Sequence, residues 1–196
     1  GMVTTNDEEL WKKMWSYKDH GKNFDSIYNK QHPPGFRWLH DSFGTNWRMM
    51  EMQAVIGRIQ LQKMPEWTRK RTENAKRILA CFEDSPYFAV HTPDADYTHA
   101  WYKCYVQVNT NALPADWSRD RIMAEINALA VPCFSGSCSE VYLEHAFDAT
   151  PWRPVQRLQN AQKLGETSLM FLVHPTLTEN NIQTTESAIQ QIISRI

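Results

Sequence analysis

Two side chains near the start of one apolar segment could bind an anion. The segment Gly44–Met64 reads GTNWRMMEMQAVIGRIQLQKM. Its apolar residues recur at three- and four-residue steps, which predicts a helix with one apolar stripe, the Met49–Ile59 stripe: Met49, Met52, Ile56 and Ile59. Thr45 or Asn46 could cap the first turn, and Arg48 would lie in that turn. A cation there is disfavoured by about 0.3–1 kcal/mol, because a helix N-terminus carries partial positive charge.

Two interpretations of Arg48 follow from this placement. In the first, the helix N-terminus, Asn46 and Arg48 together form a phosphate site, since backbone N–H groups and a guanidinium both bind phosphate oxygens. In the second, Arg48 is a surface arginine whose long stem reaches solvent. The residues alone leave both open.

Other side chains with catalytic potential form no recognisable pattern. The chain has no GxGxxG, P-loop, HExxH or GxSxG motif. Its seven histidines are scattered without metal-ligand spacing on a clear helix: His20, His32, His40, His91, His99, His145 and His174. We therefore predict no metal site and no catalytic residue from spacing.

The segment CFSGSC places Cys133 and Cys138 five positions apart. It could be a metal or redox pair, or a strand end followed by a polar turn. The spacing is not CxxC, and no second Cys/His pair with zinc-site spacing accompanies it. The sequence favours the strand end and turn.

Helices must position the anion-binding candidates in the first part of the chain. Residues 2–4 are typical of a strand end, and Thr5 opens a helix in which Glu8 completes a capping box. Gly21 can stop this helix. Residues 22–43 show no period and are predicted to be a long loop.

The helix that starts at Met49 is predicted to be long. Pro65 bends or restarts it, because proline removes a backbone donor, and the helical pattern then continues to about Phe82.

The second part of the chain is predicted to alternate strands with helices. Strands are predicted at residues 87–91, 101–108, 130–134 and 168–173. Ser118 and Thr178 can cap two helices, and residues 139–147 form a short helix or turn. The order predicts an α+β fold: a small, mostly antiparallel sheet covered by helices, with a long N-terminal helical segment. We divide the chain into residues 1–64 and 65–196.

Composition narrows the class of protein. The 196 residues are 42% hydrophobic and 22% charged, with a formal net charge of −1. Such a balance argues against a broad nucleic-acid or anionic-membrane surface. No apolar run approaches the roughly 20 residues of a transmembrane helix, and no secretory signal precedes the four cysteines. We therefore expect a cytoplasmic protein with free thiols.

The Gly44–Met64 segment resembles a signature of the DegT/DnrJ/StrS-type nucleotide-sugar aminotransferases, which are pyridoxal-phosphate enzymes of the aspartate-aminotransferase fold type. The signature is matched by Gly44, Asn46, Arg48, Met49, Glu51, Gln53, Ala54, Gly57, Gln60 and Leu61. Further matches follow in the family's order: GMVTTNDEEL, KDHGKN, HAWYKCYVQV and LVHPTLTENNI. The resemblance covers essentially the whole chain, but only the C-terminal part of the family's enzymes.

The resemblance implies that residues 1–64 are a remnant of the large domain with an interface helix, and that residues 65–196 are the small domain. The family's Schiff-base lysine lies upstream of the GMVTT-like step, so it has no counterpart here. We therefore expect this chain alone to be inactive and to bind no pyridoxal phosphate. The alternative is a non-catalytic binding or assembly module from a truncated or split reading frame.

The resemblance also implies partners and site residues. Asn46, and with it Arg48, would bind the cofactor phosphate of the other subunit of a homodimer. His99 lies where the family's small domain approaches a nucleotide-sugar substrate, and so does Ser135, which belongs to the CFSGSC turn. The CFSGSC turn departs from the family's commoner His-Tyr-containing version. Glu51 and Gln53 are expected to be structural, and glutamate is the usual amino donor.

Overall fold

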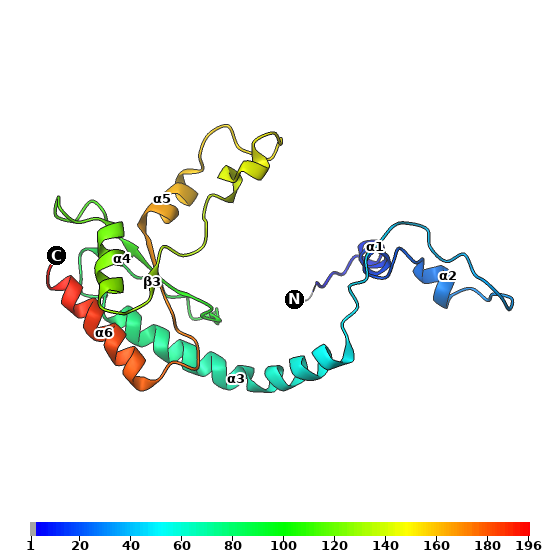
Figure 1. Ribbon diagram of the computed structural model, residues 1–196, viewed down its shortest axis with the longest axis horizontal. Coiled ribbons are helices and arrows are strands. Elements are labelled where there is room, and N and C mark those ends of the chain that lie inside the picture. The colour runs from blue at the N-terminus through cyan, green and yellow to red at the C-terminus, as the bar shows by residue number, and fades with distance from the viewer. Residues whose placement is uncertain (1–2) are drawn as a thin grey trace. The chain divides into compact units, whose positions relative to one another are not determined.

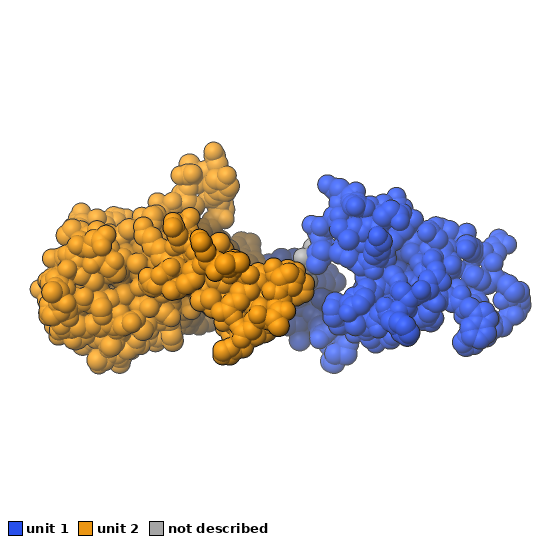
Figure 2. Space-filling view, turned by 90° about the horizontal axis from the view of Figure 1, so that it is seen from above, with its two compact units in different colours: residues 1–62 blue, residues 63–196 orange. Residues whose placement is uncertain are grey.

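The computed structural model describes residues 3–196 and divides them between two compact units. Unit 1 comprises residues up to Gln62, and unit 2 runs from Lys63 to Ile196 (Figure 2). Each unit is described by itself.

Unit 1 begins with two helices that pack through aromatic side chains. Helix α1 spans Glu8–Lys18 and α2 spans Phe24–Tyr28. The ring of Phe24 meets those of Trp11 and Trp15 edge-on, at centroid distances of 4.8 and 5.2 Å. Such edge-to-face pairs stabilise a small unit that has few buried aliphatic residues.

The predicted start of α1 was wrong. Asp7 is the N-cap, and its carboxylate accepts a hydrogen bond from the backbone N–H of Leu10. The Thr5 hydroxyl instead accepts a hydrogen bond from the backbone N–H of Asp7, because Thr5 lies two residues before the N-cap. Of the predicted strand end at residues 2–4, Met2 lies outside the described residues, and Val3 and Thr4 belong to no strand. Helix α2 occupies part of the predicted 22–43 loop.

Helix α3 spans Glu51–Ala80 without a break at Pro65 (Figure 1). Its start is two residues later than predicted, because Gln53 reaches back to accept the backbone N–H of Met50 at 3.0 Å. This contact is one half of a capping box and gives Gln53 the structural role expected of it. Proline removes one helical hydrogen bond near residue 61, and the flanking turns carry the helix across that gap.

Unit 2 is built on a four-stranded sheet with the order β1-β2-β4-β3. The strands are β1 (Phe88–Ala89), β2 (Cys104–Val108), β3 (Cys133–Phe134) and β4 (Ser168–Phe171). All three strand pairs are antiparallel. Central strand β4 is buried at every position, as its apolar run predicts.

Helices cover this sheet and confirm the α+β prediction. They are α4 (Arg119–Ala128), α5 (Gln159–Thr167) and α6 (Glu179–Ile193), with short 3₁₀ turns η1 (Val141–Leu143) and η2 (His145–Phe147). Ser118 and Thr178 cap α4 and α6 as predicted, Thr178 in a full capping box. Helix α5 was not predicted, since its start has no side-chain cap.

The core of unit 2 joins the end of α3 to the sheet and to α6. Its largest fully buried side chains include Ile78, Leu79, Phe82, Phe171 and Ile189. At its edge, Arg77 of α3 binds Glu186 of α6 through two N–H groups, each 2.7 Å from a carboxylate oxygen. Helix α6 therefore lies fixed beside the second half of α3 (Figure 1). Within residues 3–196, no helix combines the length and apolar character needed to cross a bilayer.

Candidate functional site: a paired segment in unit 1

The two residues predicted to bind phosphate lie in an extended segment that pairs with the end of α1. The backbone N–H of His20 donates to the carbonyl of Thr45 at 2.9 Å, and that of Trp47 donates to Lys18 at 3.0 Å. These two bonds flank an antiparallel bridge between Asp19 and Asn46. The bridge and its two flanking bonds therefore hold residues 45–47 against the end of α1.

This arrangement corrects the sequence-based placement. Arg48 lies three residues before α3, outside its first turn, and neither Thr45 nor Asn46 caps that helix. The Thr45 hydroxyl instead donates to the carbonyl of Tyr17 at 3.2 Å. The dipole argument made from the sequence therefore does not apply to Arg48 as it stands in the structure.

Two glycines permit the close approach of these segments. A Cβ on Gly44 would lie 2.4 Å from the backbone nitrogen of Gly21 and 2.6 Å from the carbonyl oxygen of Tyr17. Gly21 has a φ of +82°, and a Cβ there would lie 1.7 Å from the carbonyl oxygen of Ser42. A side chain at either position would push the segments apart.

The anion nearest to Arg48 is a carboxylate of the same chain. Asp19 is completely buried, and its Oδ2 accepts a hydrogen bond from Nη2 of Arg48. The ammonium of Lys22 lies 3.5 Å from Oδ1 of Asp19. Burial by itself would raise the pKa of Asp19, but the hydrogen bond from Arg48 and the charge of Lys22 outweigh it and hold that pKa below its usual value. Asp19 lies between Lys18 and Lys22 in the sequence, but its residue type and spacing predict no role for it.

The pair leaves donors free for an external anion. The Arg48 side chain is 55% exposed, and only its Nη2 is engaged. Asn46 is exposed, and its carboxamide makes no hydrogen bond to any residue that the structure describes. A planar guanidinium carries five N–H donors, so one carboxylate does not exhaust it. Both side chains therefore offer N–H donors of the kind that bind phosphate oxygens.

His99 belongs to unit 2 and to the connection between β1 and β2. Its Nδ1 accepts the backbone N–H of Trp101 at 2.8 Å, and the two rings lie 4.2 Å apart. The contact assigns the proton of the neutral ring to Nε2, because the acceptor nitrogen cannot carry it. His99 and Trp101 help to line a hollow of about 540 Å³ that Lys76 also lines.

Ser135 lines a different hollow of unit 2, of about 630 Å³. Gly136, at φ +92°, lets this turn lie against Tyr105, whose hydroxyl accepts the backbone N–H of Ser137 at 3.1 Å. Lys103 donates to the hydroxyl of Ser137 at 2.9 Å. The structure does not bring His99 and Ser135 into one pocket.

The CFSGSC segment is a strand end followed by a turn, which confirms the favoured interpretation. Cys133 is buried in β3, where burial raises the pKa of its thiol to about 12, and Cys138 is exposed in the turn. Both are free thiols. Over the described residues, no group of three or more His, Cys, Asp or Glu side chains has the arrangement of a metal site.

A buried carboxylate beside the Ser135 hollow was missed by sequence analysis. Glu140 accepts hydrogen bonds from Nε of Arg157 at 2.9 Å and from the hydroxyl of Tyr142 at 2.7 Å. These contacts lower the pKa of Glu140 to about 2. The Tyr142 hydroxyl in turn accepts the backbone N–H of Leu158, so this cluster fixes the start of α5.

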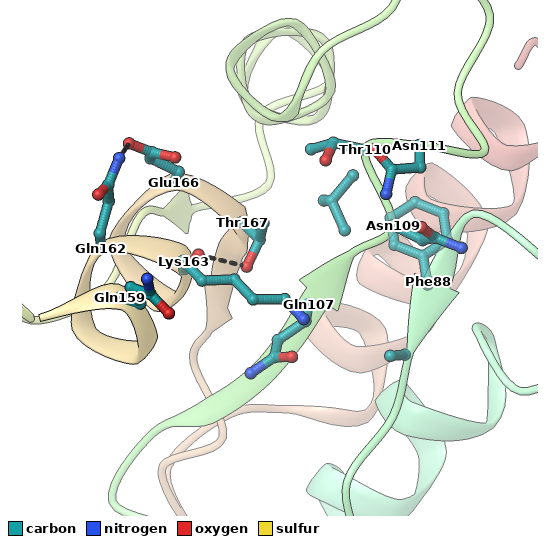
Figure 3. Close-up of a pocket in the computed structure, with 12 residues that line it drawn as sticks. Phe88, Gln107, Asn109, Thr110, Asn111, Gln159, Gln162, Lys163, Glu166 and Thr167 are labelled. Carbon is teal, nitrogen blue, oxygen red and sulfur yellow. Dashed lines mark hydrogen bonds between the residues drawn. The ribbon is translucent and has the colours of Figure 1, made fainter.

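A further hollow of about 380 Å³ lies between the β1–β2 edge and α5 (Figure 3). Its lining is rich in carboxamides, among them Gln107, Asn109 and Gln159, and the side chain of Lys163 extends towards Gln107 (Figure 3). None of the predicted site residues lines it.

The fold matches those of solved aminotransferases. A crystal structure of the aminotransferase from Psychrobacter cryohalolentis is 59% identical, with a TM-score of 0.90 over 98% of this chain and 51% of that one. The aminotransferase PseC of Helicobacter pylori, described as acting in pseudaminic acid biosynthesis, has the same fold at 20% identity, with a TM-score of 0.77 over 98% of this chain and 48% of that one.

The chain belongs to the DegT/DnrJ/EryC1/StrS aminotransferase family, whose model matches residues 1–190. A curated relative, the UDP-4-amino-4,6-dideoxy-N-acetyl-beta-L-altrosamine transaminase of Helicobacter pylori, is 37% identical over 91 residues, which cover 45% of this chain and 21% of that protein. The chain spans about half the length, or less, of these relatives.

Proposed function

We propose that these residues serve as the C-terminal part of a pyridoxal-phosphate-dependent aminotransferase that acts on a keto sugar carried on a nucleotide. Aminotransferases of this family depend on pyridoxal phosphate in general, which supports the reaction class. The Helicobacter pylori relative is by name a transaminase of a UDP-linked amino sugar, which supports a nucleotide sugar as the substrate. Glutamate is the proposed amino donor.

The observation that carries this proposal is the pair of free donors on the 45–48 segment. Pyridoxal phosphate, when bound, supplies the electron-accepting ring of the reaction, and its phosphate ester is a dianionic group by which a protein can bind it. The free carboxamide of Asn46 and the unused N–H groups of Arg48 are suited to donate hydrogen bonds to the phosphate oxygens. By resemblance, the phosphate they bind belongs to the other subunit of a homodimer.

The small domain is proposed to contact the substrate. His99 presents Nε2–H as a donor, and Ser135 presents a hydroxyl, both suited to sugar or phosphate oxygens. Because the two line separate hollows, each would contact a different part of the nucleotide sugar.

The 196-residue chain on its own is proposed to lack transaminase activity. A lysine amine must bond to the cofactor and move the substrate proton. By comparison with the family's motif, none of this chain's lysines occupies that role. Lys12 and Lys22, which are partly buried, are engaged in ion pairs with carboxylates.

A homodimer is supported by the Met49–Ile59 stripe. Its four side chains are 48–70% exposed. Met52, Ile56 and Ile59 lie on α3 and Met49 lies two residues before it, and so many large exposed apolar residues close together in the chain are unusual. An interface would remove this surface from water. The four free thiols support a cytoplasmic location for the enzyme.

A chimera tests the proposal. The 196 residues replace the matching part of the Psychrobacter cryohalolentis aminotransferase, whose 59% identity favours correct packing. We expect the purified chimera to bind pyridoxal phosphate and to transaminate a UDP-linked 4-keto sugar with glutamate. The isolated chain, assayed in parallel, should retain no pyridoxal phosphate through purification and should not transaminate. A folded, dimeric chimera without transaminase activity would contradict the proposal and favour a binding or assembly role.

A further inference from the structure

Asp19 is a buried charge that the proposed function does not use. Its side chain is only 1% exposed and is paired with Arg48 and with Lys22. Its Oδ1 has no hydrogen-bond partner among the described residues. An ionised carboxylate in such a position is costly unless cations compensate it. Here two cations and one anion leave the cluster with a net positive charge.

The backbone pairing places Asp19 on the same face as both proposed phosphate ligands. The hydrogen bonds from His20 and Trp47 flank the Asp19–Asn46 bridge, which makes it a non-hydrogen-bonded antiparallel pair. In such pairs the opposed side chains point to one face at their closest spacing. Arg48 is two residues beyond Asn46 in the extended segment, so its side chain leaves from that face as well.

Arg48 therefore has one anchored end and one free end. Asp19 binds Nη2 from the buried side, while about half of the Arg48 side chain faces solvent. A hydrogen bond to a fixed carboxylate restricts rotation of the planar guanidinium, so the remaining N–H groups have a defined direction. The carboxamide of Asn46 leaves the same face of the pairing, because Asn46 is opposite Asp19 in the backbone bridge.

We infer that Asp19 is a positioning residue, which holds the guanidinium of Arg48 with its free N–H groups beside Asn46 and so completes a half-site for a phosphate dianion. The inference rests on the proposed function, because that function supplies the phosphate. It extends the proposal by assigning the half-site's geometry to a residue that would not touch the ligand.

Asp19→Asn separates positioning from simple electrostatics, because the two predict opposite signs. Removing a negative charge near an anion site should tighten phosphate binding if Asp19 has no positioning role. Loss of positioning should weaken it, by about tenfold if one charge-assisted hydrogen bond loses its geometry. The matched control is Asp41→Asn, which removes a carboxylate from an exposed position of the same unit.

The assay is a titration of the 196-residue chain with inorganic phosphate at pH 7.5, followed by NMR signals of the Asn46 side-chain amide and Arg48 Nε–H. We expect saturable shifts in the wild type and in Asp41→Asn. In Asp19→Asn we expect weaker binding and a broadened Arg48 signal. Equal or tighter binding by Asp19→Asn overturns the inference, and so does the absence of saturable shifts in the wild type.

Slow exchange of the Thr45 and Trp47 amides reports whether the backbone pairing survives in Asp19→Asn. If the pairing is lost in Asp19→Asn, Arg48→Lys provides the test. Lysine keeps a positive charge beside Asp19 but lacks the planar guanidinium that could bind the Asp19 carboxylate and the phosphate at the same time. We expect Arg48→Lys to bind phosphate several-fold more weakly than the wild type. Wild-type affinity in Arg48→Lys overturns the inference. Activity of the chimera is measured separately, so a failure here is distinguishable from a failure of the proposed function.

Discussion

Asn46→Ala in the chimera is the cleanest perturbation of the proposed phosphate half-site. The Asn46 side chain is exposed, caps no helix and bonds to no described residue, so its loss should change the free energy of unfolding by less than about 0.5 kcal/mol. Arg48→Ala is less clean, because it leaves the buried carboxylate of Asp19 with only Lys22, at 3.5 Å, as an ion partner.

The magnitude follows from the single contact that is removed. A hydrogen bond to a charged group contributes about 1.5–3 kcal/mol. Asn46→Ala should therefore raise the dissociation constant for pyridoxal phosphate about tenfold or more while leaving the melting temperature of the apo chimera unchanged. Equilibrium dialysis with cofactor absorbance measures the first quantity, and calorimetry measures the second. Asn111→Ala, an exposed amide in unit 2, is the matched control.

A mixed dimer then tests the cross-subunit role. One subunit carries Asn46→Ala, and the other lacks only the Schiff-base lysine implied for the Psychrobacter part. The subunit that keeps its lysine receives an intact Asn46 from its neighbour, so the mixed dimer should regain activity at limiting cofactor concentration. Each homodimer should remain impaired. If heterodimers form but activity does not return, the assignment of Asn46 to the partner's phosphate is refuted.

The remaining predictions concern the chain itself. Gly44→Ala should destabilise the pairing of residues 17–22 with 45–48 by about 1–3 kcal/mol, seen as faster amide exchange at Trp47, because its Cβ would lie 2.4 Å from a backbone nitrogen. Gly57→Ala, whose Cβ meets nothing within 4 Å in a helix, should instead be neutral or stabilising. The contribution of Glu140 to the free energy of unfolding should be fully present above about pH 4.5 and be lost as the pH falls towards the folded pKa of Glu140, about 2. Arg157→Met should raise the pKa of Glu140, measured by a carbon-13 NMR titration. Borohydride reduction of the isolated chain with pyridoxal phosphate should leave no stoichiometric adduct on one lysine by mass spectrometry, whereas a site-specific adduct with turnover would identify a catalytic lysine in this chain. Sedimentation velocity at micromolar concentration should show self-association through the Met49–Ile59 stripe, and a monomer at every concentration would argue against it.

Local signals predicted much of unit 2. The caps Ser118 and Thr178 act within three residues of themselves, and the apolar run of β4 reflects burial on both faces of a central strand. Such features depend on neighbours in sequence or on burial, so they can be read from the chain. Helix α5 was not predicted, because its start depends on a hydrogen bond from Leu158 to Tyr142, 16 residues away.

The candidate site shows the opposite case. The proposed ligands Asn46 and Arg48 were identified from their residue types and a motif, but their predicted conformation was wrong, since the sequence placed both at a helix start. The pairing that holds them joins residues 25 to 29 positions apart, through Asp19 and two backbone bonds. No periodicity reports such a contact, and a lone aspartate between lysines has the pattern of an ordinary solvated surface.

The contact between Gly21 and Gly44 has a consequence for how this chain can vary over time. A side chain on Gly44 would need the space of the Gly21 backbone, and a side chain on Gly21 would need the space of the Ser42 carbonyl, so neither glycine can be replaced unless the facing segment also moves. Residues 17–21 and 42–44, although separate in the sequence, therefore constrain each other's variation. A substitution at either glycine should be tolerated only together with a compensating change in the facing segment.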